Sequence, residues 1–186
     1  MSNMNILTRR LVLLIGFLMI TLLTGCGGGG DADPVEGPSS SSLLQQQLSE
    51  LEASGGIPLL DRSRDILGPD QNRSGIRDDI EAYIATLTIN ESQRRAALQM
   101  ARALQASLAV DLSNEEALRT TSRKLSDAGQ CLSIRFPDPN EMAAMVTRLE
   151  AITANTKERT QRYIGFNTAL SGSVSRLPSG DTCDAL

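Results

Sequence analysis

The sequence predicts an all-α protein, a small helical bundle of about four main helices that follows a flexible N-terminal tether. Three observations lead to this prediction. Aromatic residues make up only 3% of the chain while Ala, Leu, Gln, Arg and Ser are abundant, a composition that favours helices over sheets. Apolar residues recur at helical spacing in the longest segments. Small polar residues that can cap a helix, with Gln or Glu three residues later, precede two of these segments.

The first 25 residues predict a signal peptide. Arg9 and Arg10 precede thirteen almost wholly apolar residues at 11–23, and a helix of that length spans ~20 Å, less than the ~30 Å hydrocarbon core of a bilayer. The segment is therefore too short for a permanent anchor and has the charge and length of a cleaved signal.

The tetrad at the end of this segment, Leu23, Thr24, Gly25 and Cys26, resembles the bacterial lipobox. In that family a lipid is attached to the cysteine and the chain is cut just before it. The resemblance implies a lipoprotein of 186 − 25 = 161 residues that is held to the membrane by the lipid on Cys26. Gram-negative lipoproteins with Asp after this cysteine tend to stay in the inner membrane. Gly27 stands there instead, which implies an outer-membrane lipoprotein of the bacterial cell envelope.

Residues 26–56 predict a flexible tether, and residues 57–186 a helical domain. Four glycines at 27–30 and four serines at 39–42 flank an acidic, Pro-containing stretch that cannot bury a core. Within this tether, leucines at near-helical spacing indicate a short helix from 42 to 53, which Gly55 and Gly56 end.

The main helices follow in order along the domain. The first carries an apolar stripe at Ile76, Ile80, Ile84 and neighbouring positions, and Arg77 and the acids that follow it are expected on the opposite, polar face. The second begins after Asn90 and presents an Ala-rich face through about residue 108, which allows close helix packing. The third is expected to begin at Ser113.

The last helix is expected to run from 141 to about 170, with Asn140 as its cap after the break at Pro137 and Pro139. Two positions of its apolar stripe are polar, Thr156 and Arg159. One interpretation is a partly exposed seam where a long helix extends beyond its bundle, and this is favoured. The other is a buried polar network or a ligand contact.

Residues 70–81 have the ligand spacing of an EF-hand calcium loop. Counted from Asp70, side-chain oxygens fall at positions 1, 3, 5, 9 and 12, Gly75 stands at position 6, and a backbone carbonyl is the ligand at position 7. The predicted calcium ligands are Asp70, Asn72, Ser74, Ile76 through its carbonyl, Asp78 and Glu81. The segment resembles the calcium loops of EF-hand and dockerin-type modules, although Arg77 occupies position 8, where a branched aliphatic residue is usual. A single loop of this kind binds weakly, with Kd ~10⁻⁴–10⁻³ M. The alternative is a polar turn that leads into a helix.

The remaining cysteines, Cys131 and Cys183, predict a disulfide bond, because an oxidising periplasm favours pairing. It would close a loop of 183 − 131 = 52 residues.

Charge and composition exclude several functions. The formal net charge of −4 argues against nucleic acid as a partner. The chain has no histidine, which excludes Ser-His and Cys-His nucleophile pairs and removes the commonest zinc ligand. The sequence therefore predicts a non-enzymatic binding or structural module of the envelope, anchored to the membrane and directed at an envelope protein or polymer. The alternative is an envelope hydrolase that uses acidic residues near the 70–81 loop.

Overall fold

The computed structural model describes residues 40–174, 176 and 178–184, and within them every regular element is a helix. The all-α prediction is thus confirmed for this part of the chain. The predicted signal peptide, the lipidated Cys26 and most of the predicted tether lie outside the described residues. Among the residues that are described, no helix combines the length and apolar character needed to cross a bilayer.

Six helices follow one another along the described chain. The short helix expected at 42–53 is present as the first of them. Their bounds are α2 (Ser40–Ala53), α3 (Asp78–Thr86), α4 (Glu91–Ala109), α5 (Glu115–Arg135), α6 (Pro139–Thr153) and α7 (Lys157–Ala169).

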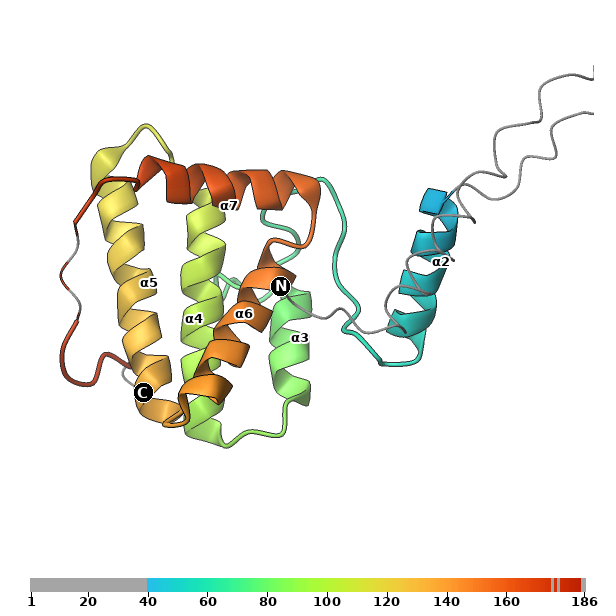
Figure 1. Cartoon of the computed structure of the whole chain (residues 1–186), viewed down its shortest axis with the longest axis horizontal. Coiled ribbons are helices and arrows are strands. Elements are labelled where there is room, and N and C mark those ends of the chain that lie inside the picture. Colours follow the sequence, from blue (N-terminus) through green and yellow to red (C-terminus); the bar gives the residue numbers. More distant parts are fainter. Residues whose placement is uncertain (1–39, 175, 177, 185–186) are drawn as a thin grey trace, which may run out of the picture. The chain divides into compact units, whose positions relative to one another are not determined.

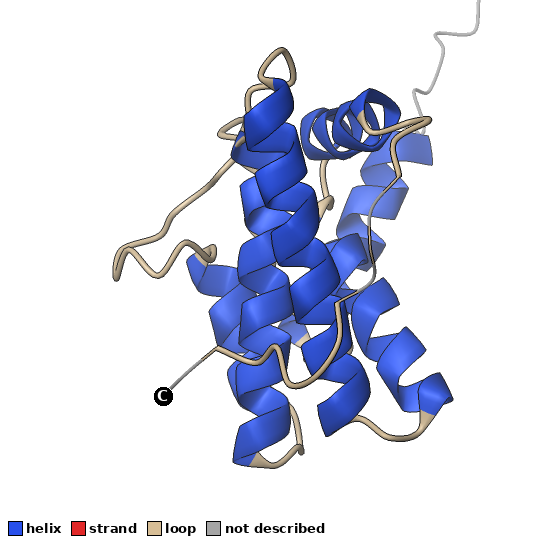
Figure 2. Ribbon diagram, turned by 90° about the vertical axis from the view of Figure 1, so that its left-hand side faces the viewer, coloured by secondary structure: helices blue, strands red, loops and turns tan. Residues whose placement is uncertain are grey.

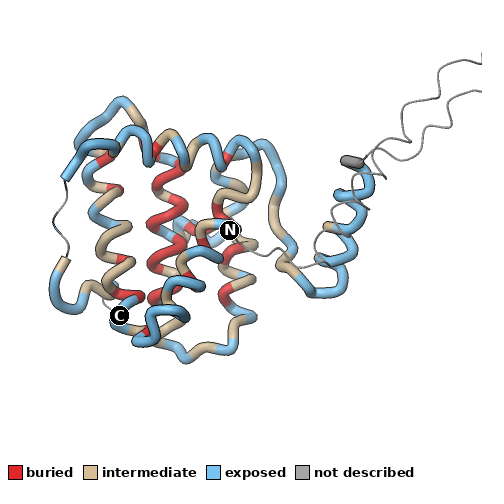
Figure 3. The backbone as a smooth tube through the Cα atoms, in the orientation of Figure 1, coloured by how far each residue is buried: buried red, intermediate tan, exposed pale blue. Residues whose placement is uncertain are grey.

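Helix α4 is the centre of the domain and packs against α3, α5, α6 and α7. Figure 1 shows α3, α4, α5 and α6 side by side with α7 lying crosswise over one end, and Figure 2 shows the same array from the side. The buried positions of α4 include four alanines, as the Ala-rich face predicts, and Figure 3 shows that burial is concentrated along this helix. Small side chains let the neighbouring helices approach α4 closely.

The helix starts follow ordinary capping chemistry. Asn90 and Gln93 form the predicted capping box of α4. The cap of α5 is Asn114, one residue after the predicted Ser113, because the Asn114 side chain accepts the Ala117 N–H. The cap of α6 is Asp138 rather than Asn140, since Pro139 fits the first turn of a helix and extends α6 toward the N-terminus.

The prediction of one helix from 141 to 170 is wrong. Helix α6 ends at Thr153, and Thr156 adopts an extended conformation whose hydroxyl accepts the Arg159 N–H, which makes it the N-cap of α7. The chain turns here, and Arg159 is completely buried. The favoured interpretation of a partly exposed seam is therefore also wrong, and the buried polar network is correct.

The predicted disulfide bond between Cys131 and Cys183 is present. It fixes the segment after α7 against α5. Hydrogen bonds continue the attachment, because the Thr182 hydroxyl donates to the Asp127 carbonyl and Gln99 of α4 donates to the Thr182 carbonyl. By loop-closure entropy a bridge of this span stabilises the fold by ~3–4 kcal/mol.

Candidate functional site

Asp70 closes the 70–81 loop with its carboxylate. One oxygen accepts the N–H of Ser74 at 3.0 Å and the other accepts the N–H of Gly75 at 2.9 Å. The turn requires left-handed backbone at two positions, Arg73 with φ 57° and Gly75 with φ 80°. A glycine at the second position avoids the strain that a side chain would impose. The predicted role of Gly75 in a sharp turn agrees with this conformation.

The start of the loop lies against the first turn of α3. The Asn72 amide donates to the Glu81 carboxylate at 2.7 Å, and the Gln71 N–H donates to the Asp78 carboxylate at 3.0 Å. The Asp78 N–H in turn donates to the Pro69 carbonyl at 2.8 Å. The loop therefore brings predicted ligands from both its ends, 70–72 and 78–81, close to one another.

Ser74 and Ile76 occupy the middle of the loop. The Ser74 hydroxyl accepts the Ile76 N–H at 3.2 Å and donates to the Ile76 carbonyl at 3.4 Å. The Ile76 side chain is completely buried in the main core. From α4, Arg102 donates to the Ser74 carbonyl at 2.9 Å. The loop is thus fixed to the bundle on two sides.

The donor set of the loop suits a hard cation. It consists of three carboxylates, an amide oxygen, a hydroxyl and a carbonyl, the oxygen ligands that Ca²⁺ prefers. Among the described residues, no three acidic, histidine or cysteine side chains are grouped so as to hold a metal by themselves. A calcium ion at the loop would need the neutral oxygens as well. The Asp70 oxygens that accept backbone N–H groups keep further lone pairs for this.

The acids at the start of α3 each have a protein partner. Asp78 accepts from Gln71, Glu81 accepts from Asn72, and Asp79 accepts from both the Arg77 side chain and the Asp61 N–H. These contacts hold the carboxylates in structural roles.

Arg77 is a correction to the sequence prediction, which placed it on the polar face of α3. Its side chain is completely buried. The guanidinium pairs with Asp79 at 2.6 Å and donates to the carbonyls of Ile152 and Thr153, the last residues of α6. In an EF-hand pair the residue at position 8 packs against a second loop. Here that residue is Arg77, and it binds the C-terminal end of α6.

A second buried arginine holds the segment that precedes the loop. Arg159 pairs with Asp61 at 2.5 Å and donates to the carbonyls of Asp61, Asp65 and Ile66. The Asp61 N–H donates to the Asp79 carboxylate at 2.6 Å and so joins the two arginine pairs. We call Arg77, Asp79, Arg159 and Asp61 the arginine network. Its residues position the chain from 61 to 70 against α3, α6 and α7. The sequence offered a buried network at Arg159 only as the less favoured interpretation and gave no sign of Arg77, because most acceptors of the two arginines are backbone carbonyls.

The environment of Asp61 shifts its acidity. Burial alone would raise the pKa of Asp61, but hydrogen bonds from Arg159 and Ser63 outweigh it, and the pKa lies below its ordinary value of 3.8. A carboxyl group with a lower pKa in the folded state stabilises the fold while it is ionised. That stabilisation is lost as the pH falls through the folded-state pKa.

We expect Asp61→Asn to reduce the acid sensitivity of the fold. The wild type should lose free energy of unfolding as the pH falls below the unfolded-state pKa of about 3.9. The variant should be less stable at pH 7, because Arg159 lacks its counter-charge. Its free energy of unfolding should fall less than that of the wild type over the same pH range. Urea unfolding at pH 7, 5, 4 and 3 measures this. Asp65→Asn, whose carboxylate does not contact Arg159, is the control. Parallel pH profiles for the wild type and Asp61→Asn would contradict the assignment.

We expect Gly68→Ala to destabilise the domain strongly. Gly68 has φ 65°, and an added Cβ would lie 2.4 Å from Cδ of Arg77 and 2.9 Å from the Asp61 carboxylate. Gly172→Ala is the matched control, since Gly172 has φ 80° with nothing within 4 Å of an added Cβ. Backbone strain alone should cost the control about 1 kcal/mol, and crowding should cost Gly68→Ala a further ~1–3 kcal/mol. Equal losses in urea unfolding would show that the arginine network tolerates the added methyl group.

Comparison of the chain with protein-family models, with curated proteins and with solved structures found no match.

Proposed function

We propose that this protein is a lipid-anchored, non-enzymatic helical module that binds a partner in the bacterial cell envelope, with a calcium ion in the 70–81 loop as a stabilising clamp. The lipid on Cys26 would hold the module to the outer membrane, and the partner would be an envelope protein or polymer. The anchor rests on the lipobox tetrad, the charged and apolar signal segment before it, and the Gly- and Ser-rich tether after it.

The observation that carries the calcium proposal is the closure of the loop by Asp70. Its two oxygens hold the N–H groups of the fifth and sixth loop residues, Ser74 and Gly75, so the chain already curls around the first predicted ligand. Glu81, the last predicted ligand, lies near the start of α3 and accepts a hydrogen bond from the Asn72 amide. A loop that is already closed needs little further ordering to bind an ion, which favours binding.

A clamp is favoured over a catalytic metal for two reasons. The arginine network fixes residues 61–70 on one side of the loop and α3 on the other, so an ion between the two ends would strengthen a connection that the fold already makes. A hydrolytic metal would need an open coordination position and a general base beside it. The neighbouring acid Asp79 is instead held by Arg77.

We expect Ca²⁺ to raise the melting temperature of the purified protein. An ion that binds only the folded state stabilises it by RT ln(1 + [L]/Kd), which is about 1.4–2.7 kcal/mol at 10 mM Ca²⁺ for a Kd of ~0.1–1 mM. For a domain of this size that corresponds to a rise of about 3–10 °C. Thermal melts followed by circular dichroism, with EGTA and with added Ca²⁺, measure the shift.

Glu81→Gln tests the ligand assignment, because it keeps the shape of the side chain and removes the charge. The calcium shift should disappear in this variant while the melting temperature in EGTA changes little. Glu141→Gln, at the exposed start of α6, is the matched control and should keep the full shift. A wild-type melting temperature that does not respond to Ca²⁺ would mean that the segment is a polar turn.

We expect Cys26→Ser to block processing and to leave the signal segment on the chain. The wild-type mature protein should begin at Cys26 and carry the mass of an acylated N-terminus, since the lipid is added to the sulfur before the chain is cut. Intact mass spectrometry of both proteins from membranes of the expressing cell measures this. An unmodified mature N-terminus, or one that begins at another residue, would rule out the lipid anchor.

A further inference from the structure

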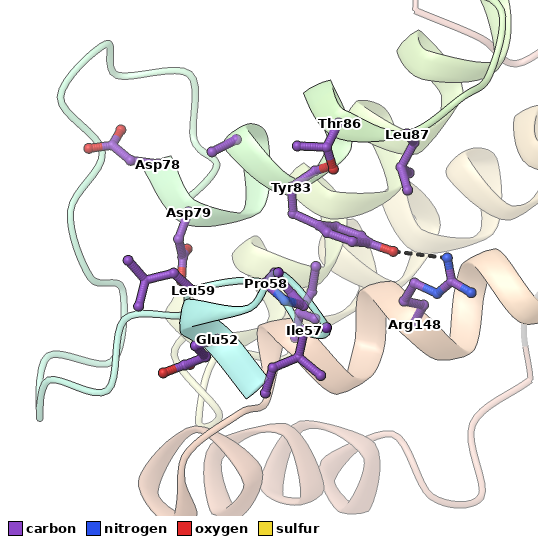
Figure 4. Close-up of a pocket in the computed structure, with 14 residues that line it drawn as sticks. Glu52, Ile57, Pro58, Leu59, Asp78, Asp79, Tyr83, Thr86, Leu87 and Arg148 are labelled. Carbon is purple, nitrogen blue, oxygen red and sulfur yellow. Dashed lines mark hydrogen bonds between the residues drawn. The ribbon is translucent and has the colours of Figure 1, made fainter. Parts of the chain in front are cut away.

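A cleft opens between α3 and α6, with the chain after α2 as its rim. Its volume is about 1020 Å³, and it is lined mainly by apolar side chains, among them Tyr83 from α3, Leu87 at the end of that helix, Ile152 from α6, and Ile57, Pro58 and Leu59 from the rim. Figure 4 shows Tyr83 in the middle of the cleft, where its hydroxyl accepts a hydrogen bond of 3.0 Å from Arg148. Leu59 is 75% exposed. We call this surface the α3–α6 cleft.

The charges of the cleft are separated along its length. Figure 4 shows Asp78 and Asp79 toward one end and Arg148 toward the other. Asp79 is neutralised by Arg77 at 2.6 Å, and Glu52 on the rim is neutralised by Arg62 at 2.5 Å. Asp78 and Arg148 form no ion pair among the described residues. The cleft therefore offers a negative end and a positive end on either side of an apolar middle.

Helix α2 carries an apolar stripe that the described domain leaves largely exposed. Leu44, Leu48 and Leu51 follow one another at helical spacing; Leu44 and Leu51 are 65% and 49% exposed, and Leu48 is half-buried. Neither hydrophobic core of the described chain includes a residue of α2. The only charged residues of this helix are Glu50 and Glu52, both near its C-terminus.

The helix and the cleft match in both polarity and charge. If α2 lay along α3 in the same direction, the positive end of its dipole would face Asp78 and Glu50 would approach Arg148. The leucine stripe would then lie over Tyr83, Leu87 and Ile152. The reverse direction would bring Glu50 close to Asp78, which like charges disfavour. The charges thus select one orientation.

We propose that α2 of one copy of this protein binds the α3–α6 cleft of a second copy, so that the chain self-associates by exchanging this helix. The α2 helix of the same copy is poorly placed to fill the cleft, because the C-terminal end of that helix forms part of the rim. Glu52 lines the cleft, pairs with Arg62 and accepts the Leu60 N–H. The Gly56 N–H donates to the Leu51 carbonyl at the end of the helix.

A membrane surface is a poorer match for α2. Helices that lie on anionic lipid carry Lys or Arg on their polar face, and α2 has neither. The proposal does not depend on the lipid anchor, and because Asp78 is also a proposed calcium ligand, its negative charge is available to α2 when no ion is bound.

Cross-linking between two cysteine variants of the mature full-length chain tests the exchange. One copy carries Leu48→Cys and the other, which is tagged, carries Leu87→Cys; they are mixed in detergent micelles and treated with a short bismaleimide. The native Cys131 and Cys183 are joined to each other and do not react. We expect a cross-linked dimer of one tagged and one untagged chain. In the control pair, Gln46→Cys on the opposite face of α2 replaces Leu48→Cys. The yield of the cross-linked dimer should be at least tenfold higher for the Leu48→Cys pair than for this control. The chain without added cysteines gives the background.

Leu44→Glu in the otherwise unchanged chain gives a second readout. It places a charge in the stripe without touching the domain, so the dimer seen by native mass spectrometry should fall at least tenfold while helical content and melting temperature stay the same. Three outcomes would overturn the proposal: equal yields from the Leu48→Cys and Gln46→Cys pairs, a monomer at all concentrations, or a dye on Leu48→Cys that responds to phosphatidylglycerol vesicles but not to a second copy.

Discussion

The structure depends on arginine side chains that bind the backbone carbonyls at the ends of helices. Arg94 donates to the carbonyls of Ile84 and Leu87 at the end of α3, Arg162 to those of Leu108 and Val110 at the end of α4, and Arg77 to those of Ile152 and Thr153 at the end of α6. Helix ends leave several carbonyls without an internal partner, and glycine caps often supply the solution. Here guanidiniums from other helices or from loops supply it, and each such contact also joins two elements. The helix ends and the tertiary contacts are therefore stabilised by the same bonds.

Burial makes two of these contacts decisive. Arg77 and Arg159 are completely buried, and each has a carboxylate beside it, Asp79 and Asp61. A buried charge that loses its partner costs about 3–5 kcal/mol, so neither pair can be broken without loosening the chain between residues 61 and 70. That chain leads directly into the 70–81 loop. The loop keeps its position because the arginine network fixes both its approach and, through Asp79, the start of α3. An ion bound at the loop would act on a scaffold that is already in place.

The sequence predicts those parts of the structure whose causes are local. The apolar stripe at Ile76, Ile80 and Ile84, the capping box of α4 and the pairing of Cys131 with Cys183 each follow from spacing or from count, and the structure contains all three. The turn between α6 and α7 has a weaker local signal, because residues 154–156 include neither glycine nor proline and only Asn155 and Thr156 are residues that favour turns and caps. Thr156 caps α7 locally, but the side chain of Arg159 finds its acceptors in residues 61–66, more than ninety positions away. The turn of the 70–81 loop at Gly75 could be predicted from the spacing, but the burial of Arg77 beside it could not.

The use of arginine also shapes the electrostatics of the surface. Of the 18 basic residues only two are lysines, and several arginines face inward to carbonyls or buried carboxylates. Each completely buried arginine pairs with a neighbouring acid, as Arg77 does with Asp79. Such a pair removes one cation and one anion from the outer surface. Arg162, which donates to the carbonyls of Leu108 and Val110, is half-buried and stays partly at the surface. Because the two completely buried arginines are each paired with one acid, they leave the net charge of −4 to the other residues of the chain. A negative surface raises the local concentration of divalent cations and repels acidic polymers. This would favour the weak calcium site that we propose, and it would direct the proposed binding toward neutral or basic surfaces.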